Sequence, residues 1–224
     1  MLSTHRDAID VIQTVAAGFA ALGTTGAVVW AIWGERLRAR RTRPRLTIAN
    51  FDPASADAVE LNASAWARLR VCNRPHTRPA EDVEVLIERV DVLTSATDER
   101  QKALAYSPAP LGSLADRALK WADRASPTVK IPPDATRRID LLHIDQPPGG
   151  QGTPTELKLT FWDEPQDGRH RLPGLEYAIT LAIEGRNIDR LKYGVTVSFD
   201  GQWLNGHAIW GSVKLGPVKP IKTK

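Results

Sequence analysis

The sequence contains very little sulfur and no motif typical of a catalytic or metal site. Among 224 residues there is one cysteine, Cys72, so no disulfide can form within the chain and the count favours a reducing compartment. The five histidines do not occur in pairs four residues apart, and no Cys/His spacing suits zinc. Neither a Gly-x-Ser-x-Gly elbow nor a phosphate-binding Gly-Lys-Ser/Thr loop is present. We therefore expect no cofactor, no resident metal and no enzyme.

The net positive charge of the chain comes from its N-terminal fifth. The formal net charge is +4, and residues 1–45 hold seven Lys or Arg residues against three acids, which accounts for all of it. Residues 46–224 hold 23 residues of each sign. This larger part is neutral overall and offers no electrostatic attraction for a polyanion.

An uncharged stretch occupies residues 11–34, with sixteen apolar residues, four Gly, three Thr and one Gln. As a helix it would extend about 36 Å, and the hydrocarbon core of a bilayer is about 30 Å thick. A surface helix would need a strongly charged face, and a signal peptide would carry its charge before the apolar run. A buried helix of a soluble protein is the remaining alternative. We predict a transmembrane helix, preceded by a short extracytoplasmic segment at residues 1–10.

The end of this stretch has the composition of a membrane interface. Trp30 and Trp33 stand where aromatic rings lie at headgroup level. They are followed by six arginines: Arg36, Arg38, Arg40, Arg41, Arg43 and Arg45. The positive-inside rule then places the C-terminal domain in the cytoplasm, with the basic linker at residues 35–44 on the anionic inner leaflet. The alternative is a nucleic-acid-binding arm at residues 36–45, which the neutral domain and the absence of a recognition motif disfavour.

One face of the predicted helix is built mainly from small residues, which permit close approach of helices in lipid. Its members are Gln13, Ala16, Ala20, Gly23 and Ala27. This face predicts a homo-oligomer, although an alanine-rich helix produces such a face by chance as well.

After Pro44 the apolar residues recur with a period of two, which is typical of β-strands. We expect a β-domain at residues 45–215 and a disordered basic tail at residues 216–224. Strands are predicted at residues 45–50, 66–73, 82–93, 129–131, 137–144, 155–162, 175–184, 191–199 and 208–215. Hairpin turns are predicted at Asp167-Gly168 and Asp200-Gly201, and short helices at residues 98–106 and 113–124. Many short alternating strands favour an antiparallel β-sandwich.

Two motifs resemble bacterial immunoglobulin-like domains of the CARDB kind. In RLRVCNRPHTRPAEDVEVLI a strand ends at Asn73, and Ala80 opens the next strand. In LPGLEYAITLAIEGRN a Pro-Gly pair precedes a strand that contains Tyr177. Arg74-Pro75 stands where the family often has Gly after the Asn. The layout is also similar to that of uncharacterised bacterial single-pass membrane proteins with such a domain. The resemblance implies an immunoglobulin-like sandwich and no chemistry.

Three groups of residues are candidates for function. The stretch WDEPQDGRH brings Asp163, Glu164, Asp167 and His170 together, as a cation site or simply as turn residues. Arg68 and Arg70 form a basic patch, or pair across strands with Glu84 and Glu88. Trp203 and Trp210 belong to the core or line a binding surface.

The leading functional hypothesis is a membrane-anchored binding or scaffolding protein whose cytosolic domain recognises another macromolecule, with a protein as the expected partner. An enzyme that uses the loop at residues 163–170 is the first alternative. A nucleic-acid-binding protein that uses the arginine run at residues 36–45 is the second.

Overall fold

The structure, a computed structural model, describes residues 29–38, 41–61, 63–93, 106–108, 115–166, 168, 170–172 and 176–222. The chain divides into two compact units, Met1–Arg43 and Pro44–Lys224. In the first unit, residues 29–38 are helical. In the described part of the chain no helix has the length and apolar character needed to span a bilayer. Residues 11–28, most of the predicted transmembrane segment, lie outside the described residues.

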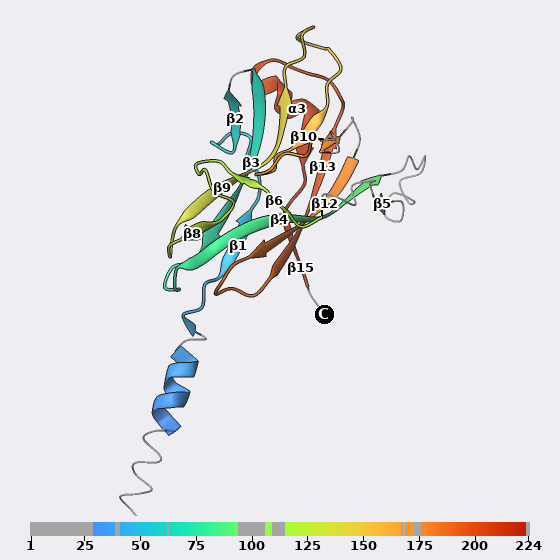
Figure 1. Ribbon diagram of the computed structural model, residues 1–224. Helices are drawn as coiled ribbons and strands as arrows, with labels where there is room; N and C mark the ends of the chain where they lie inside the picture. Colours follow the sequence, from blue (N-terminus) through green and yellow to red (C-terminus); the bar gives the residue numbers. More distant parts are fainter. Residues whose placement is uncertain are drawn as a thin grey trace, which may run out of the picture. The chain divides into compact units, whose positions relative to one another are not determined.

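The second unit is built from two antiparallel sheets (Figure 1), which confirms the prediction of a mainly β, sandwich-like fold. Among the described residues the first sheet has the order β1 (Leu46–Ala49), β3 (Ser64–Asn73), β9 (Thr136–Asp145), β10 (Leu157–Leu159), β11 (Arg171–Leu172), with β2 (Ala58–Leu61) beside β3 and β7 (Lys120–Trp121) beside β9. The second sheet has the order β14 (Val213–Leu215), β13 (Leu191–Phe199), β12 (Glu176–Glu184), β4 (Ala80–Leu93), β5 (Tyr106–Pro108), with β15 (Lys219–Ile221) beside β13 and with β6 (Arg117–Ala118) and β8 (Val129–Ile131) beside β4.

Strict alternation of small or apolar residues with polar residues makes β3 a two-faced strand. Ala65, Ala67, Leu69 and Val71 are fully buried, while the intervening side chains lie on the outer face. This is the pattern that allows one face of an antiparallel strand to cover a core and the other to meet water. The outer face of the first sheet is therefore polar, and the apolar core lies between the sheets.

A β-bulge in β9 interrupts the alternation and shapes the outer face. The register with β3 shifts between Ala67 and Arg68, which leaves Leu141 as the extra residue. Leu141 and Leu142 are consecutive and both fully buried, which regular alternation would forbid. Beyond the bulge His143 faces outward, opposite Trp66.

Residues 117–121 pass from one sheet to the other. Arg117 and Ala118 pair with β4, whereas Lys120 and Trp121 pair with β9. The helix predicted at residues 113–124 is therefore wrong for these residues, which are extended because they close one side of the core. On the other side, the Tyr193 hydroxyl of β13 donates a hydrogen bond to the Leu46 carbonyl of β1 at 3.1 Å.

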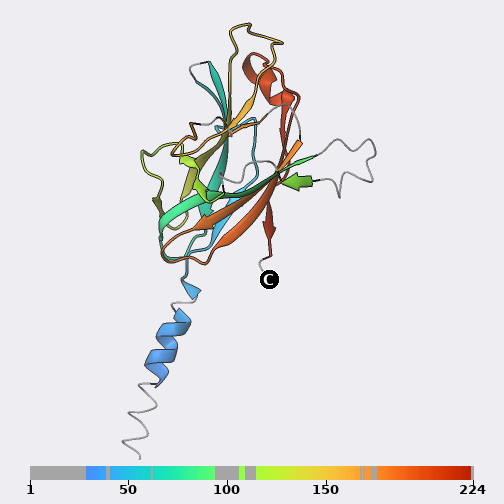
Figure 2. The ribbon, with the colours of Figure 1, turned by 45° about the vertical axis from the view of Figure 1, so that its right-hand side comes forward.

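Of the two predicted hairpins, the first has a different second strand in the structure, whereas the strands of the second, β13 and β14, do pair, across a longer connection than the predicted turn. The strand β10 pairs with the short β11, and β12 lies in the other sheet between β4 and β13. After β13 the chain forms a 3-10 turn η1 (Gly206–Ala208) and one turn of helix α3 (Ile209–Ser212) before β14. The strand predicted at residues 208–215 begins only at Val213. In both Figure 1 and Figure 2 this helical turn and β2 lie near the same end of the sandwich.

Candidate functional site

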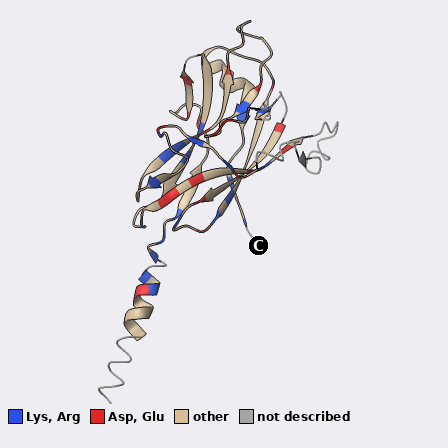
Figure 3. Ribbon diagram, in the orientation of Figure 1, with Lys and Arg blue, Asp and Glu red and all other residues tan. Residues whose placement is uncertain are grey.

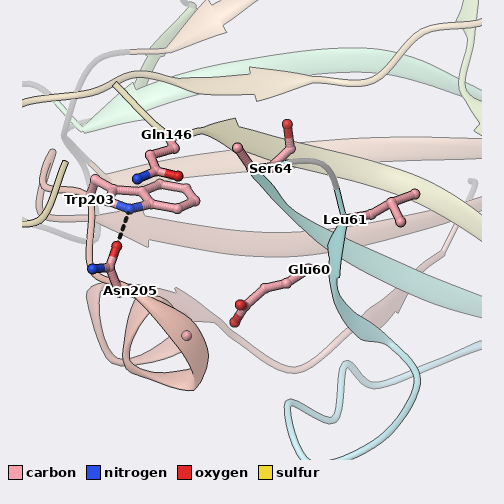
Figure 4. A pocket seen from close by; sticks show the side chains of 8 residues that line it. Glu60, Leu61, Ser64, Gln146, Trp203 and Asn205 are labelled. Carbon is pink, nitrogen blue, oxygen red and sulfur yellow. Dashed lines mark hydrogen bonds between the residues drawn. The ribbon is translucent and has the colours of Figure 1, made fainter. Parts of the chain in front are cut away.

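A groove lies between β2 and the segment from Trp203 to Trp210. It consists of two adjoining hollows of about 300 and 340 Å³, which share Glu60 and Gly206 in their walls. Figure 4 shows the first hollow, with Glu60 extending from β2 toward the segment that carries Trp203 and Asn205. The full lining of the two hollows is Ala58, Val59, Glu60, Leu61, Ala63, Ser64, Gln146, Trp203, Asn205, Gly206, His207 and Trp210. We call this feature the β2 groove.

One wall of the β2 groove is a hairpin strand that the sequence prediction missed. Leu61 pairs with Ser64, and between them Ala63 has a positive φ of 62°. The signal was present, because the alternating stretch Ala-Val-Glu-Leu precedes an Asn-Ala pair and Trp66. Leu61 is the last residue of β2 and lies at the lip of the groove, where its side chain is 57% exposed.

The other wall is held in place by backbone and side-chain hydrogen bonds. The Trp203 N–H donates to the Thr153 carbonyl at 3.0 Å, and the Trp203 carbonyl accepts from the Gly152 N–H at 2.7 Å. The Trp203 indole N–H donates to Asn205 Oδ1 at 2.8 Å, which fixes the Asn205 amide in the groove. At Gly206, with φ +62°, no atom lies within 4 Å of the position of a Cβ. This wall is therefore rigid at Trp203 and open at Gly206.

Both tryptophans belong to the core, which is one of the two alternatives for them in the sequence analysis, and both also line the groove. Trp203 is 5% exposed and Trp210 is 9% exposed. The Trp210 ring packs on Phe51 with centroids 5.5 Å apart and planes tilted by 53°. Its indole Nε1 is buried and has no hydrogen-bond partner among the described residues. A buried donor without an acceptor costs about 1–3 kcal/mol, so this N–H is an unsatisfied group beside the second hollow.

The carboxylate at the foot of the hairpin is the most deeply buried charge described in the structure. Asp57 has an exposed fraction of 0%, and its oxygens lie 3.0 Å from Arg70 Nε and 3.3 Å from Arg138 Nε. Its backbone carbonyl accepts from the Arg68 N–H at 2.8 Å, so Asp57 joins the start of β2 to the first sheet. The Asp57–Arg70 contact has the distance but not the alignment of a hydrogen bond, and we treat it as an ion pair.

The basic patch on β3 is neutralised within its own sheet. Arg68 Nε pairs with Asp140 at 2.7 Å, and Arg70 pairs with Asp57. The predicted partners Glu84 and Glu88 are wrong, because β4 lies in the other sheet and the neighbours of β3 are β1, β2 and β9. Figure 3 shows basic and acidic residues interspersed over the strands, which agrees with the absence of a net charge in this part of the sequence.

A hydrogen-bonded cluster on the outer face adjoins the β2 groove through Ser64. Asp145 accepts hydrogen bonds from Ser64 Oγ at 2.5 Å and from Lys158 Nζ at 2.5 Å. The His143 ring stacks on Trp66 with centroids 4.6 Å apart, and its Nδ1 lies 2.9 Å from Thr160 Oγ1. This cluster fixes one corner of the groove.

Burial and hydrogen bonding together set the protonation of this cluster. It lowers the pKa of His143, whose imidazole is therefore neutral at pH 7. Burial alone would raise the pKa of the Asp145 carboxyl, but the hydrogen bonds from Lys158 and Ser64 outweigh it and the pKa is lowered. Thr160 is buried, so its contact with His143 does not expose a nucleophile to a substrate.

The structure describes only part of the candidate cation loop at residues 163–170. His170 is buried with Nε2 2.8 Å from Glu164 Oε1, without the alignment of a hydrogen bond, and Asp163 points to solvent. Asp167 lies outside the described residues. Over the residues that are described, no group of three or more His, Cys, Asp or Glu side chains could hold a metal ion.

The predicted membrane-interface residues divide between the two units. Trp30 and Trp33 are exposed on the helix at residues 29–38. The arginines Arg36, Arg38, Arg41, Arg43 and Arg45 are also exposed, and Arg40 lies outside the described residues. The predicted helix-packing residues Gln13, Ala16, Ala20, Gly23 and Ala27 lie outside the described residues as well.

Comparisons with protein families, with curated protein sequences and with solved structures find no match to this chain.

Proposed function

We propose that the protein is a membrane-anchored binding protein that holds another macromolecule in the β2 groove. The observation that carries the proposal is the construction of the groove, an edge strand facing a braced loop with an exposed leucine at the lip. Rigid walls reduce the entropy lost on binding, and an exposed apolar side chain beside a hollow provides an anchor. These are features of a recognition surface.

The side chains of the groove favour binding over catalysis. Glu60 and His207 are the titratable side chains of its described lining, no hydrogen bond or ion pair joins them, and the Ser64 hydroxyl is already donated to Asp145. General acid–base or nucleophilic chemistry needs a reactive group with a partner in reach of the substrate. Amide, carboxylate and hydroxyl groups around an apolar lip instead match the polar rim of an interface.

The finer fold that we propose is an immunoglobulin-like sandwich, and the motif residues support it by their positions. Asn73 ends β3 and is buried; its amide donates to the carbonyls of Arg78 and Ile131 and accepts from Thr77 and from the Arg45 N–H. Such a side chain defines the turn between β3 and β4. Sandwiches of this kind commonly bind partners with end loops and edge strands.

Membrane attachment is the second part of the proposal. It is supported by the uncharged stretch at residues 11–34, by the exposed Trp30 and Trp33, and by the arginines that follow. Anchoring would hold the domain on the cytoplasmic side and raise the local concentration of a bound partner. Carbonate extraction of membranes from cells that produce the full chain tests this part. Retention in the membrane pellet is expected, and complete release would overturn the anchor.

Site-specific photo-crosslinking tests the binding function. A benzophenone amino acid replaces Leu61 at the groove lip, and in a matched control it replaces Lys130, whose side chain is 62% exposed on β8. Irradiation of intact cells is expected to give a discrete adduct from position 61 that position 130 does not give. Identical adduct patterns at the two positions would show that the groove is not a recognition surface.

A further inference from the structure

The free edge of β2 determines what kind of partner the groove fits. In the described part of the chain β2 pairs with β3 alone, so its second edge has no strand beside it. Backbone groups in an antiparallel strand point alternately to one neighbour and to the other. Three observations show which residues point outward. The Asp57 carbonyl bonds to β3, the Ala58 N–H turns away to Ser55, and Leu61 closes a two-residue turn with Ser64. The N–H and C=O of Glu60 therefore point to the free edge of β2.

The Glu60 side chain reinforces this edge. Glu60 lies opposite the buried Ala65, so its side chain is on the inner side of β2, where Figure 4 shows it directed across the hollow. It forms no ion pair among the described residues. Val59 and Leu61 lie opposite Trp66 and Ser64, on the outer side. An added strand would meet a carboxylate on one face and two apolar side chains on the other.

We infer that the occupant of the β2 groove is an extended polypeptide segment that adds a strand to β2, with a Lys or Arg opposite Glu60 and apolar residues on both sides of that base. This inference rests on the proposed function and names its partner class. The four residues of β2 span about 13 Å, enough for the main-chain pairing that gives affinity in strand addition. Alternate side chains then supply specificity, the base by charge and its neighbours by contact with Val59 and Leu61.

Other occupants fit less well. A sugar ring needs an exposed aromatic face on which to stack, but Trp203 and Trp210 are more than nine-tenths buried. A second copy of the chain paired through its own β2 would place two Glu60 side chains on one face of the joint sheet, directly opposite or diagonal, where like charges repel. A basic peptide avoids both difficulties.

A charge-swap experiment with synthetic peptides tests the inference. The full chain in non-ionic detergent is titrated into fluorescein-labelled Ser-Thr-Val-Lys-Val-Thr-Ser, and binding is followed by fluorescence anisotropy. Glu60→Lys is expected to weaken binding about tenfold and to favour the peptide in which Glu replaces Lys, because an attractive pair becomes a repulsive one. The control Glu156→Lys, at an exposed glutamate away from the groove, is expected to change the affinity less than twofold.

Backbone pairing has its own controls. Glu60→Pro removes the outward N–H at an edge position where proline is tolerated, and it is expected to bind about fivefold more weakly than Glu60→Ala. In the peptide, N-methylation of the Lys amide is expected to weaken binding, whereas N-methylation of the following Val amide leaves it unchanged, because successive amides face opposite edges.

The outcomes separate this inference from the proposed function. If position 61 still gives a specific crosslink but Glu60→Lys does not reverse the peptide preference, or Glu60→Pro binds as tightly as Glu60→Ala, binding stands and the inference of a basic added strand is overturned. If sedimentation shows a dimer that Glu60→Pro converts to a monomer, the occupant is a second copy and the inference is overturned. The reversal of preference, with the Glu156→Lys variant unchanged, supports it.

Discussion

Replacing Asp57 with Asn tests whether a buried ion cluster holds β2 in place. Asp57 is fully buried, and Arg70 and Arg138 contact its two oxygens at 3.0 and 3.3 Å. Removing one partner of a buried ion pair costs about 3–5 kcal/mol when the charge left behind has no access to water. Here the side chains of Arg70 and Arg138 are 34% and 42% exposed, so water can solvate both guanidinium groups. We therefore expect a loss of about 2 kcal/mol in the free energy of unfolding.

Urea unfolding of the full chain, followed by tryptophan fluorescence, measures this loss. The control is Asp163→Asn, because that side chain is 94% exposed and its Oδ2 lies 3.9 Å from Nη1 of Arg117. Its expected effect is below about 0.5 kcal/mol, as for most surface substitutions. A loss below 1 kcal/mol for Asp57→Asn, or one equal to that of the control, would refute the role of this cluster.

The same variant links stability to the groove. Asp57 immediately precedes β2, and the loss of its contacts frees the start of that strand from β3. Hydrogen exchange at Val59 and Leu61, whose amides bond to β3 by the alternation of the ladder, is expected to accelerate more than exchange at Leu69 in the strand centre. Uniform acceleration would show that Asp57 stabilises the whole domain without a special effect on β2.

Three further predictions concern titration and packing. Burial lowers the pKa of His143, so protonation of this side chain favours the unfolded chain. The neutral imidazole therefore stabilises the fold above the ordinary pKa of 6.5, and this stabilisation is lost as the pH falls below 6.5. Urea midpoints at about pH 7.5 and 5.5 should therefore differ less in His143→Gln than in the parent, and equal differences would contradict this. Burial raises the pKa of Tyr177 from its ordinary value of 10.0 to about 12. The neutral phenol therefore stabilises the fold below pH 10, and this stabilisation is lost as the pH rises from 10 to about 12. The free energy of unfolding of Tyr177→Phe should fall less over this alkaline range than that of the parent. A Cβ at Gly185 would lie 2.8 Å from the Glu81 carbonyl oxygen, so Gly185→Ala should lower the free energy of unfolding by about 1–3 kcal/mol. Gly211 has open space around its Cβ position in a helical turn, so Gly211→Ala should cause no loss. Thermal unfolding of the two variants measures both effects.

The strands of the core could be predicted because their pattern is local. Residues 66–73 alternate strictly, and the observed β3 extends the prediction by only two residues. The strand predicted at residues 129–131 coincides with β8. In these segments a buried face and a period of two suffice to define the conformation. The mainly β class followed from the same signal.

Pairing between strands could not be predicted in the same way, because it depends on which sheet a strand joins. Arg68 and Arg70 were matched with Glu84 and Glu88 because β3 and β4 are adjacent in sequence. In the structure β4 belongs to the second sheet. One neighbour of β3 is β9, which lies much later in the sequence; it provides Asp140 and places Arg138 beside Asp57. Charged residues on the outer face of a strand indicate that residues of opposite charge lie nearby, but they do not show where in the sequence those residues are.

The β2 groove lies where the observed sheet pairing differs from the strands that the local sequence pattern predicts. The strands β1 and β2 share one edge of β3, with β1 on residues 70–73 and β2 on residues 64–67, so that edge is divided between two short strands. After β13 the chain takes a helical path from Gly206 to Ser212 before it can pair again as β14. The sequence pattern predicts a strand at residues 208–215, but residues 208–212 are helical. Among the described residues no strand pairs with the outer edge of β2, so the main-chain groups of Glu60 lie at an open edge near the two hollows. Proteins normally protect such an edge with charge, a proline or a covering element. Here a single carboxylate provides that protection, and it also selects by charge the strand that can bind.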